Sequence, residues 1–240
     1  MVINRTLLMK KIIFITAAFC VFFVSCGKID NYDAPSATLS GQVIDKVTGK
    51  PILTDQPNGF RVRYKELSEV YPNAQNYYFW GKADGTFNNS KLFKGQYEVC
   101  PVEGAFITPE AKRVEIPGNV TFEVTPYLSI TQDKVTFNAS SKTLSVSFNV
   151  SRPSGSNASP KTAIVAVSWN PAVGYFVHGT DGTGVLETRN ISEADLDSSL
   201  SFEIDMSALP SGHEWYVRMG CSSSLDPSRY NYSDIHSFTY

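Results

Sequence analysis

Alternation of apolar and polar side chains with a period of two constrains the fold of this chain more than any other feature. The pattern is clearest in residues 60–65, 144–151 and 200–206, where every second residue is apolar. Strands of this kind bury one face and expose the other, as the strands of antiparallel β-sandwiches do. Clusters of Gly, Pro, Asn and Asp separate the alternating segments at short intervals and favour turns. The sequence therefore predicts an all-β protein.

The length of 240 residues favours two compact domains, although a single long sandwich fits the same length. We place the boundary near residue 127 and predict β-sandwiches over residues 36–126 and 127–240. The helical signal is slight, because it covers a single turn. Ser192 precedes Asp195 by three residues, which is the spacing of a capping box.

Residues 1–25 have the pattern of a secretory signal peptide, with Lys10 and Lys11 before an apolar run over residues 12–24. This run of 13 residues is too short to cross a bilayer as a helix. Its end, residues 23–26, resembles the lipobox of bacterial lipoproteins, although Phe stands where Leu is usual. The resemblance implies that Cys26 is lipidated and anchors the chain to a membrane. The alternative is an ordinary signal peptide that ends nearby.

The segment that follows, residues 26–35, is polar and ends in Pro, which suits a flexible tether. The charge of the chain argues against nucleic-acid binding. Residues 1–25 hold three basic residues and no acidic ones, so the remainder has 18 basic and 23 acidic residues and a net charge of −5. A nucleic-acid-binding protein needs a basic face to neutralise phosphates. We therefore expect no nucleic-acid partner.

Two thiols remain in the mature chain if Cys20 is removed with the signal peptide and Cys26 is lipidated. These are Cys100 and Cys221, one in each predicted domain. An exported protein occupies a compartment that permits disulfides, so a bridge between the domains is one interpretation. The other is that each thiol is buried separately as a small apolar side chain.

The first half carries the motifs G-x-V-x-D, T-G-x-P-I, D-G-x-F and G-x-Y-x-V within residues 39–52, 83–87 and 92–99. This series resembles the carboxypeptidase-regulatory-like domain, a transthyretin-like β-sandwich. In the second half, Leu209 and Trp215 resemble the tyrosine corner of fibronectin type III domains, an immunoglobulin-like sandwich. A Trp at the corner position changes the reach of the hydrogen bond that a Tyr would make.

The lipobox together with the order of these motifs resembles the pattern of a family of uncharacterised Bacteroidetes lipoproteins. Such proteins are commonly encoded beside SusC-like and SusD-like outer-membrane proteins for glycan uptake. The resemblance implies an outer-membrane lipoprotein and brings no catalytic residues with it. Asp30 and Asp33 loosely resemble the surface-export signal of these lipoproteins, which favours the cell surface over the periplasmic face.

The sequence offers no pattern of an enzyme. It contains no G-x-S-x-G elbow, P-loop or Rossmann glycine motif, and His178, His213 and His236 lie far apart without metal-ligand spacing. Residues 181–184 and 193–197 are the best calcium candidates, because hard oxygen ligands suit that ion. We interpret them as a turn and a helix cap. We therefore predict no catalytic residue, no metal and no cofactor.

Aromatic residues gather in three segments of the chain, 71–80, 169–176 and 230–232, and are candidates for binding sugars. Residues 77–80 are four consecutive aromatic residues. If they form a strand, alternation must direct two of the rings to each of its faces. Exposed rings beside amide side chains suit sugars, whose C–H faces stack on rings while their hydroxyls form hydrogen bonds. The candidates are Tyr71, Tyr77, Tyr78, Trp80, Trp169, Tyr175, Tyr230 and Tyr232. The alternative is that these rings pack inside the protein, as we expect for Tyr97 and Trp215.

The leading hypothesis is an accessory glycan-binding lipoprotein that holds oligosaccharides or polysaccharides near a SusC-like and SusD-like transporter. The alternative is a structural or assembly subunit whose rings contact a protein partner. Rings that line a concave groove with Asn, Gln or Asp would favour sugar. A flat apolar patch would favour protein.

Overall fold

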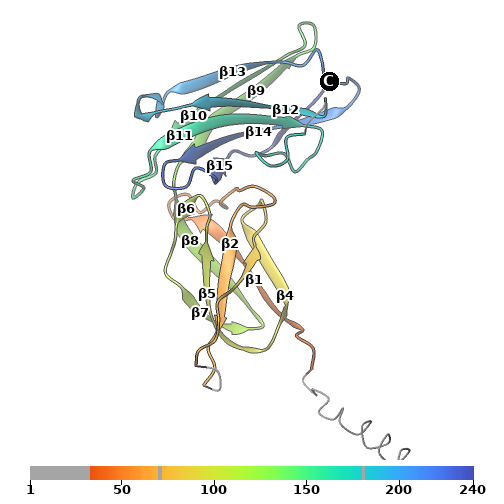
Figure 1. The fold of residues 1–240 in the computed structure, drawn as a ribbon. Helices are drawn as coiled ribbons and strands as arrows, with labels where there is room; N and C mark the ends of the chain where they lie inside the picture. Colours follow the sequence, from red (N-terminus) through yellow and green to blue (C-terminus); the bar gives the residue numbers. More distant parts are fainter. Residues whose placement is uncertain (1–32, 70–71, 180–181) are drawn as a thin grey trace, which may run out of the picture. The chain divides into compact units, whose positions relative to one another are not determined.

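A computed structural model describes residues 33–69, 72–179 and 182–240 (Figure 1). The predicted signal peptide, Cys26 and most of the predicted tether lie outside the described residues. Within the described part of the chain, no helix is long and apolar enough to cross a membrane. Residues 35–240 form one compact unit.

The prediction of an all-β protein is confirmed. The strands are β1 (Ala37–Asp45), β2 (Arg61–Glu66), β3 (Tyr77–Trp80), β4 (Thr86–Leu92), β5 (Gly95–Val102), β6 (Phe106–Ile107), β7 (Lys112–Ile116), β8 (Gly118–Pro126), β9 (Ser129–Asn138), β10 (Thr143–Ser151), β11 (Pro160–Ser168), β12 (Gly184–Asn190), β13 (Ser199–Asp205), β14 (Glu214–Ser223), β15 (Tyr230–Tyr232) and β16 (His236–Thr239). A 3₁₀ turn, η1, covers Glu193–Asp195.

The first sandwich packs the sheet β4-β1-β8-β6 against the sheet β3-β2-β5-β7. Its core includes Leu39, Phe60, Phe122 and Tyr97, so the expected burial of Tyr97 is confirmed. Among the described strand pairs, β1 and β8 alone run parallel, which departs from the antiparallel pairing that we predicted. Parallel neighbours require a long crossover, and residues 46–117 supply it, because they form the whole opposite sheet as well as β4 and β6.

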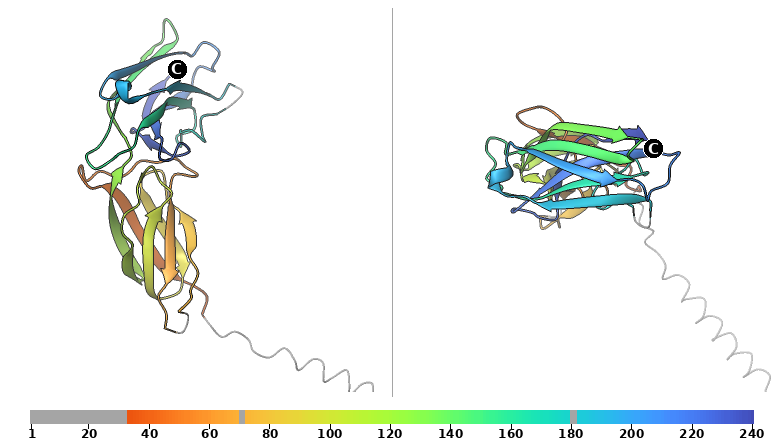
Figure 2. Two further views of the ribbon diagram at one scale, coloured as in Figure 1. Left: turned by 60° about the vertical axis from the view of Figure 1, so that its left-hand side comes forward. Right: turned by 90° about the horizontal axis from the view of Figure 1, so that it is seen from above.

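The second sandwich packs β13-β10-β9 against β12-β11-β14-β15, with β16 also paired to β14 (Figures 1 and 2). Trp215 is fully buried in its core, as expected. The indole Nε1 donates a hydrogen bond to the carbonyl of Pro210 at 3.3 Å, five residues upstream. An indole therefore makes the local hydrogen bond at the position where the resemblance implies a tyrosine corner.

The two thiols are buried separately. Cys100 and Cys221 are both free, and neither is bridged. Burial raises the pKa of each thiol above its ordinary value. Of the two interpretations, the structure supports two small apolar side chains in separate sandwiches.

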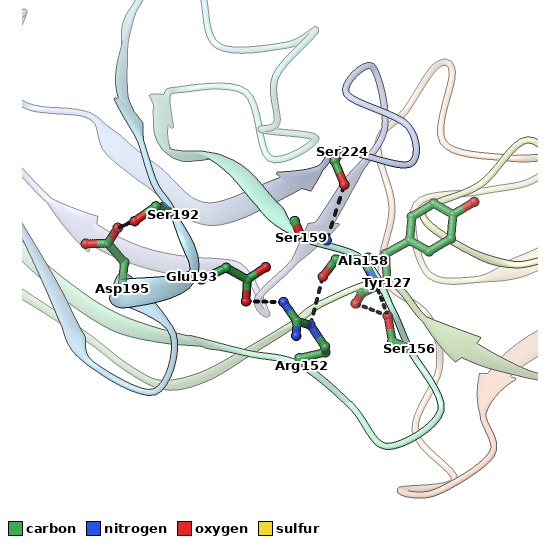
Figure 3. A network of polar contacts seen from close by, with 9 residues as sticks. All are labelled: Tyr127, Arg152, Ser156, Ala158, Ser159, Ser192, Glu193, Asp195 and Ser224. Atoms are coloured by element: carbon green, nitrogen blue, oxygen red, sulfur yellow. Dashed lines mark hydrogen bonds and ion pairs between the residues drawn. The ribbon is translucent and has the colours of Figure 1, made fainter.

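In the segment of residues 193–197, which we interpret as a helix cap, the carboxylates of Glu193 and Asp195 accept hydrogen bonds from neighbouring side chains or backbone. In η1, the Asp195 carboxylate accepts hydrogen bonds from Ser192 N at 2.7 Å and Ser192 Oγ at 2.9 Å, as Figure 3 shows. Glu193 accepts from the guanidinium of Arg152, whose Nε also donates to the Ala158 carbonyl at 2.9 Å. Both side chains therefore serve local structure. Residues 180–181, which include part of the other calcium candidate, lie outside the described residues.

Candidate functional site

Strand β3 carries four consecutive rings at the edge of its sheet, paired on one side with β2. Phe79 packs against the core of the first sandwich, and Tyr77 stacks on Tyr64 with a centroid distance of 5.7 Å. Tyr77, Tyr78 and Trp80 remain 57%, 44% and 41% exposed, so Tyr77 is exposed even though it shares a side of the strand with Phe79. Alternation thus separates the four rings as predicted, with Tyr78 and Trp80 on the outer side of the sheet.

Arg61 of β2 lies between the two exposed rings. Its Cζ is 4.4 Å from the centroid of the Tyr78 ring and 5.7 Å from that of Trp80, distances at which a cation interacts with a ring face. The guanidinium forms an ion pair with Glu103, and this hydrogen bond raises the pKa of Arg61. Its Nε is buried and has no hydrogen-bond partner among the described residues.

Arg229 reaches the same face from the second sandwich, one residue before β15 begins. Its Nε donates to the Glu103 carbonyl at 2.8 Å, and one terminal nitrogen donates to the Asn58 carbonyl at 2.7 Å. Its Cζ lies 5.6 Å from the centroid of the Trp80 ring. The rings and guanidinium groups thus alternate in the order Tyr78, Arg61, Trp80, Arg229. We call these four residues the aromatic–arginine ladder.

Tyr230 and Tyr232 do not form the exposed platform that the sequence suggested, and this is a correction. Each is only 7% exposed, because these residues of β15 pack where the two sandwiches meet. Tyr230 stacks on Tyr175, which is only partly exposed, with a centroid distance of 4.9 Å. Burial raises the pKa of Tyr230 to about 12. The neighbouring Phe176 remains exposed and meets Tyr175 edge to face.

The remaining predicted rings lie apart from the ladder or outside the described residues. Trp169 is 44% exposed and follows the end of β11. It packs against Trp215 and His213, with centroid distances of 6.3 Å and 5.5 Å. Tyr71 lies outside the described residues. The structure therefore brings Tyr78 and Trp80 into one site and places Trp169 in a separate cluster.

A cleft of about 520 Å³ lies at the junction of the sandwiches. Its polar lining includes Asp45, Lys50, Gln132 and Asp234, but Tyr232 is the one predicted ring that borders it. The exposed rings of β3 thus lie on a sheet face and the groove lies elsewhere. The combination of several rings with a concave, amide-lined groove is not found at this cleft.

A buried polar network joins the two sandwiches. Tyr232 donates its hydroxyl proton to Asp55, and Tyr175 N donates to the Tyr232 oxygen at 2.9 Å. Arg218 donates to the carbonyls of Thr54 at 2.9 Å and Ser233 at 3.1 Å. This network holds β15 against the loop between β1 and β2. It therefore also fixes the position of Arg229.

Burial is the main influence on the charged groups of this network. It raises the pKa of the Asp55 carboxyl and lowers that of the Arg218 guanidinium. Asp55 Oδ1 is buried without a hydrogen-bond partner among the described residues, and a Cβ at Gly174 would approach it to 2.3 Å. Glycine at position 174 therefore allows the loop after β11 to cover the carboxylate.

Sequence reasoning did not identify the charged members of the site. Arg61 could have been found by pairing the alternating residues of β2 with those of β3, since Arg61 lies opposite Trp80. Arg229 has no such signal, because only the packing of the two sandwiches brings it to β3.

The fold and this face define the chain as a two-sandwich β-protein with exposed rings and arginines on one sheet. Residues 37–126 match the model of the DUF3823 N-terminal domain, described as a protein of unknown function, so the first sandwich corresponds to that domain. No protein with a curated description matches the chain in sequence.

Solved structures cover both sandwiches. A DUF3823 family protein from Bacteroides uniformis is 26% identical, with a TM-score of 0.70 over 85% of this chain and 99% of its own. A second Bacteroides uniformis protein, described as a "putative carbohydrate binding protein", is 21% identical, with a TM-score of 0.70 over 86% of this chain and 100% of its own. A DUF3823 family protein from Parabacteroides merdae is 19% identical, with a TM-score of 0.67 over 86% and 100%. The last two similarities show the fold alone.

Proposed function

We propose that this protein is a non-catalytic carbohydrate-binding lipoprotein of the cell envelope, and that the aromatic–arginine ladder is its binding site. The observation that carries the proposal is the exposure of Tyr78 and Trp80 on one sheet face with charged hydrogen-bonding groups between and beside them. Sugar C–H groups stack on such rings, and guanidinium N–H groups donate to hydroxyls. The description of the second Bacteroides uniformis protein supports the same role.

The state of the carboxylates near the ladder supports a binding role without catalysis. Glu103 is ion-paired with Arg61, and Glu98 lies 3.4 Å from the Arg63 guanidinium. Glycoside hydrolysis requires one carboxyl that carries a proton and a second that is free to act as nucleophile or base. Two carboxylates held by arginines suit a binding face better than a hydrolytic site.

The proposed location is the outer membrane, with the chain on the cell surface and anchored through Cys26. Support comes from the lipobox resemblance and the polar segment of residues 26–35. An anchor beside SusC-like and SusD-like proteins would give the ladder a high effective concentration near the transporter. Weak affinity for each oligosaccharide would then be sufficient.

A structural or assembly role is the second candidate, because one observation favours it. The exposed rings lie on a sheet face and not in the cleft at the junction. A ring-bearing face of that kind can also receive a protein partner, for which an exposed Trp and Arg are typical anchors.

Titration against plant and host polysaccharides, followed by calorimetry and tryptophan fluorescence, tests the proposed function. The sample is the chain from residue 27 onward, which contains the whole compact unit 35–240. We expect saturable binding that weakens by about tenfold or more in Trp80→Ala, the scale of an aromatic hot spot. Trp169→Ala is the matched control, because it removes an equally exposed indole from the separate cluster. Failure of every polysaccharide to bind would favour the structural role.

A further inference from the structure

The geometry points to acidic glycans, whose sugars carry carboxylate or sulfate groups, as the ligand class of the aromatic–arginine ladder. This inference rests on the proposed function and specifies its ligand. It starts from Arg229, whose guanidinium donates to two backbone carbonyls and has no carboxylate partner among the described residues. Among the described residues, therefore, no carboxylate neutralises the positive charge of Arg229.

The position of Arg229 is fixed before any ligand arrives. Its two hydrogen bonds to backbone carbonyls hold the guanidinium in place. The hydrogen bond between Tyr232 and Asp55 holds the adjoining strand β15 against the first sandwich. A guanidinium carries five N–H donors in a planar fork, so donors remain after the bonds to Glu103 and Asn58. A charge that is fixed and still has free donors loses little entropy when it binds an anion.

The spacing suits one sugar residue that touches both a ring and a charge. The Arg229 Cζ lies 5.6 Å from the centroid of the exposed Trp80 ring. Arg61 and Arg229 both lie over the Trp80 ring, so a pyranose would pack against the part of the ring that remains exposed and place a substituent within reach of Arg229. Arginine binds carboxylate and sulfate-like oxygens through two parallel hydrogen bonds, which a neutral hydroxyl cannot match.

The wider face has the sign that this ligand class requires. Strand pairing places several charged residues on the outer side of the sheet β3-β2-β5-β7. Glu103 and Arg229 lie beside this face and contribute their charges to it. The basic residues are Arg61, Arg63, Lys65, Arg113 and Arg229, and the acidic residues are Glu98, Glu103 and Glu115. This face is net positive, although residues 26–240 as a whole have a net charge of −5. A net positive face attracts an acidic polysaccharide, although its three carboxylates oppose that attraction locally.

Matched pairs of oligosaccharides with the same backbone, one member acidic and the other neutral, test the inference. One pair is an oligogalacturonide and its methyl ester, and the other is a sulfated galactan oligosaccharide and its desulfated form. We expect the chain from residue 27 onward to bind at least one acidic member about tenfold or more tightly than its neutral counterpart, because a neutral group leaves the Arg229 donors without a matching acceptor. Binding of the acidic member should weaken as salt is raised from 50 to 500 mM.

Substitutions in and beside the ladder test whether the preference for acidic oligosaccharides arises there. Arg229→Gln should reduce the preference for the acidic member to near onefold, and Arg229→Lys should retain part of it. Arg113→Gln is the matched control, since it removes the same charge from the outer side of the same sheet at strand β7. Circular dichroism checks that each variant folds, and the comparison within each oligosaccharide pair uses the unaltered chain, so it stands even if Arg229→Gln does not fold.

The outcomes separate the inference from the proposed function. Equal binding of acidic and neutral members, or binding of neutral glycans alone, with both lost in Trp80→Ala, would overturn the acidic class and leave carbohydrate binding intact. An acidic preference that Arg113→Gln removes and Arg229→Gln does not would also overturn the assignment to the ladder. Failure to bind any glycan, neutral or acidic, would overturn both proposals.

Discussion

The hydroxyl of Tyr232 donates a hydrogen bond to the carboxylate of Asp55, and this contact joins residues 177 positions apart in the chain. Tyr232 belongs to β15 in the second sandwich, and Asp55 lies in the loop between β1 and β2 in the first. Arg218 places its guanidinium 4.4 Å from the centroid of the Tyr232 ring and adds a hydrogen bond to Thr54. The strand that completes this junction begins directly after Arg229. The stability of the junction and the geometry of the ladder are therefore linked.

Removal of the Tyr232 hydroxyl tests the junction. Tyr232→Phe leaves the buried Asp55 carboxylate without its donor and Tyr175 N without its acceptor. We expect the free energy of unfolding to fall by about 1–3 kcal/mol, the cost of leaving buried polar groups unpaired. Urea denaturation measures it. Tyr216→Phe is the control, because its hydroxyl bonds to the exposed Glu214 at 2.9 Å; an equal loss in both variants would contradict the assignment.

Titration of Asp55 should contribute to the pH dependence of the free energy of unfolding. Burial raises the pKa of its carboxyl above the ordinary value of 3.8 and outweighs Tyr232 and Arg218, which lower it. A carboxyl with a raised pKa binds more protons in the folded state than in the unfolded state, so its contribution to the free energy of unfolding declines as pH rises above 3.8. Asp55→Asn lacks this decline. Its stability relative to the unaltered chain should therefore increase with pH across that window.

Asp195 provides a control of the opposite sign for the pH measurement. Hydrogen bonds from the backbone and side chain of Ser192 lower the pKa of its carboxyl below 3.8. Its contribution is present above 3.8 and is lost as pH falls, so Asp195→Asn should lose stability relative to the unaltered chain as pH rises. Urea denaturation at several pH values from 3 to 7 measures both slopes. Parallel slopes for the two variants would rule out the role of burial at Asp55.

The sequence predicted the strands better than it predicted their surroundings. Alternation in residues 144–151 matches the alternating burial of β10. In β11 the same rule does not apply, because Ala163–Ser168 are buried without interruption. One face of β11 packs in the second core, and Ile164 on the other face packs with Tyr230 and Tyr232 at the junction. Tyr175, Tyr230 and Tyr232 of the second sandwich, with Leu53 of the first, thus cover this second face.

The candidate site was predictable in part for the same reason. The placement of Tyr78 and Trp80 on one side of β3 follows from the two-residue period of a strand, which is a local property, whereas the exposure of Tyr77 on the other side does not. Burial of Tyr230 and Tyr232 depends on residues from distant parts of the chain, such as Ile164, Tyr175 and Asp55, which no local pattern contains. Arg229 joined the site by the same long-range packing.

The indole hydrogen bond of Trp215 accounts for a distinct part of the stability. Trp215→Phe removes the donor to the Pro210 carbonyl and leaves a cavity in the second core, where Trp215 has no exposed surface. We expect a loss of about 2 kcal/mol or more in the free energy of unfolding. Trp169→Phe, at an exposed position, should cost less than about 0.5 kcal/mol. Comparable losses in the two variants would contradict a core role for Trp215.

The two buried thiols predict a simple pattern of chemical reactivity. Only thiolates react rapidly with disulfide reagents, and burial both blocks access to Cys100 and Cys221 and raises the pKa of each thiol. In the folded chain from residue 27 onward, a colorimetric disulfide reagent at pH 8 should therefore titrate almost no thiol within minutes. After unfolding in guanidinium chloride without reductant, it should titrate two thiols per chain, because the structure has both cysteines free. A count near zero after unfolding would instead demonstrate a bridge, and a rapid reaction in the folded chain would show that at least one of the two sites opens readily.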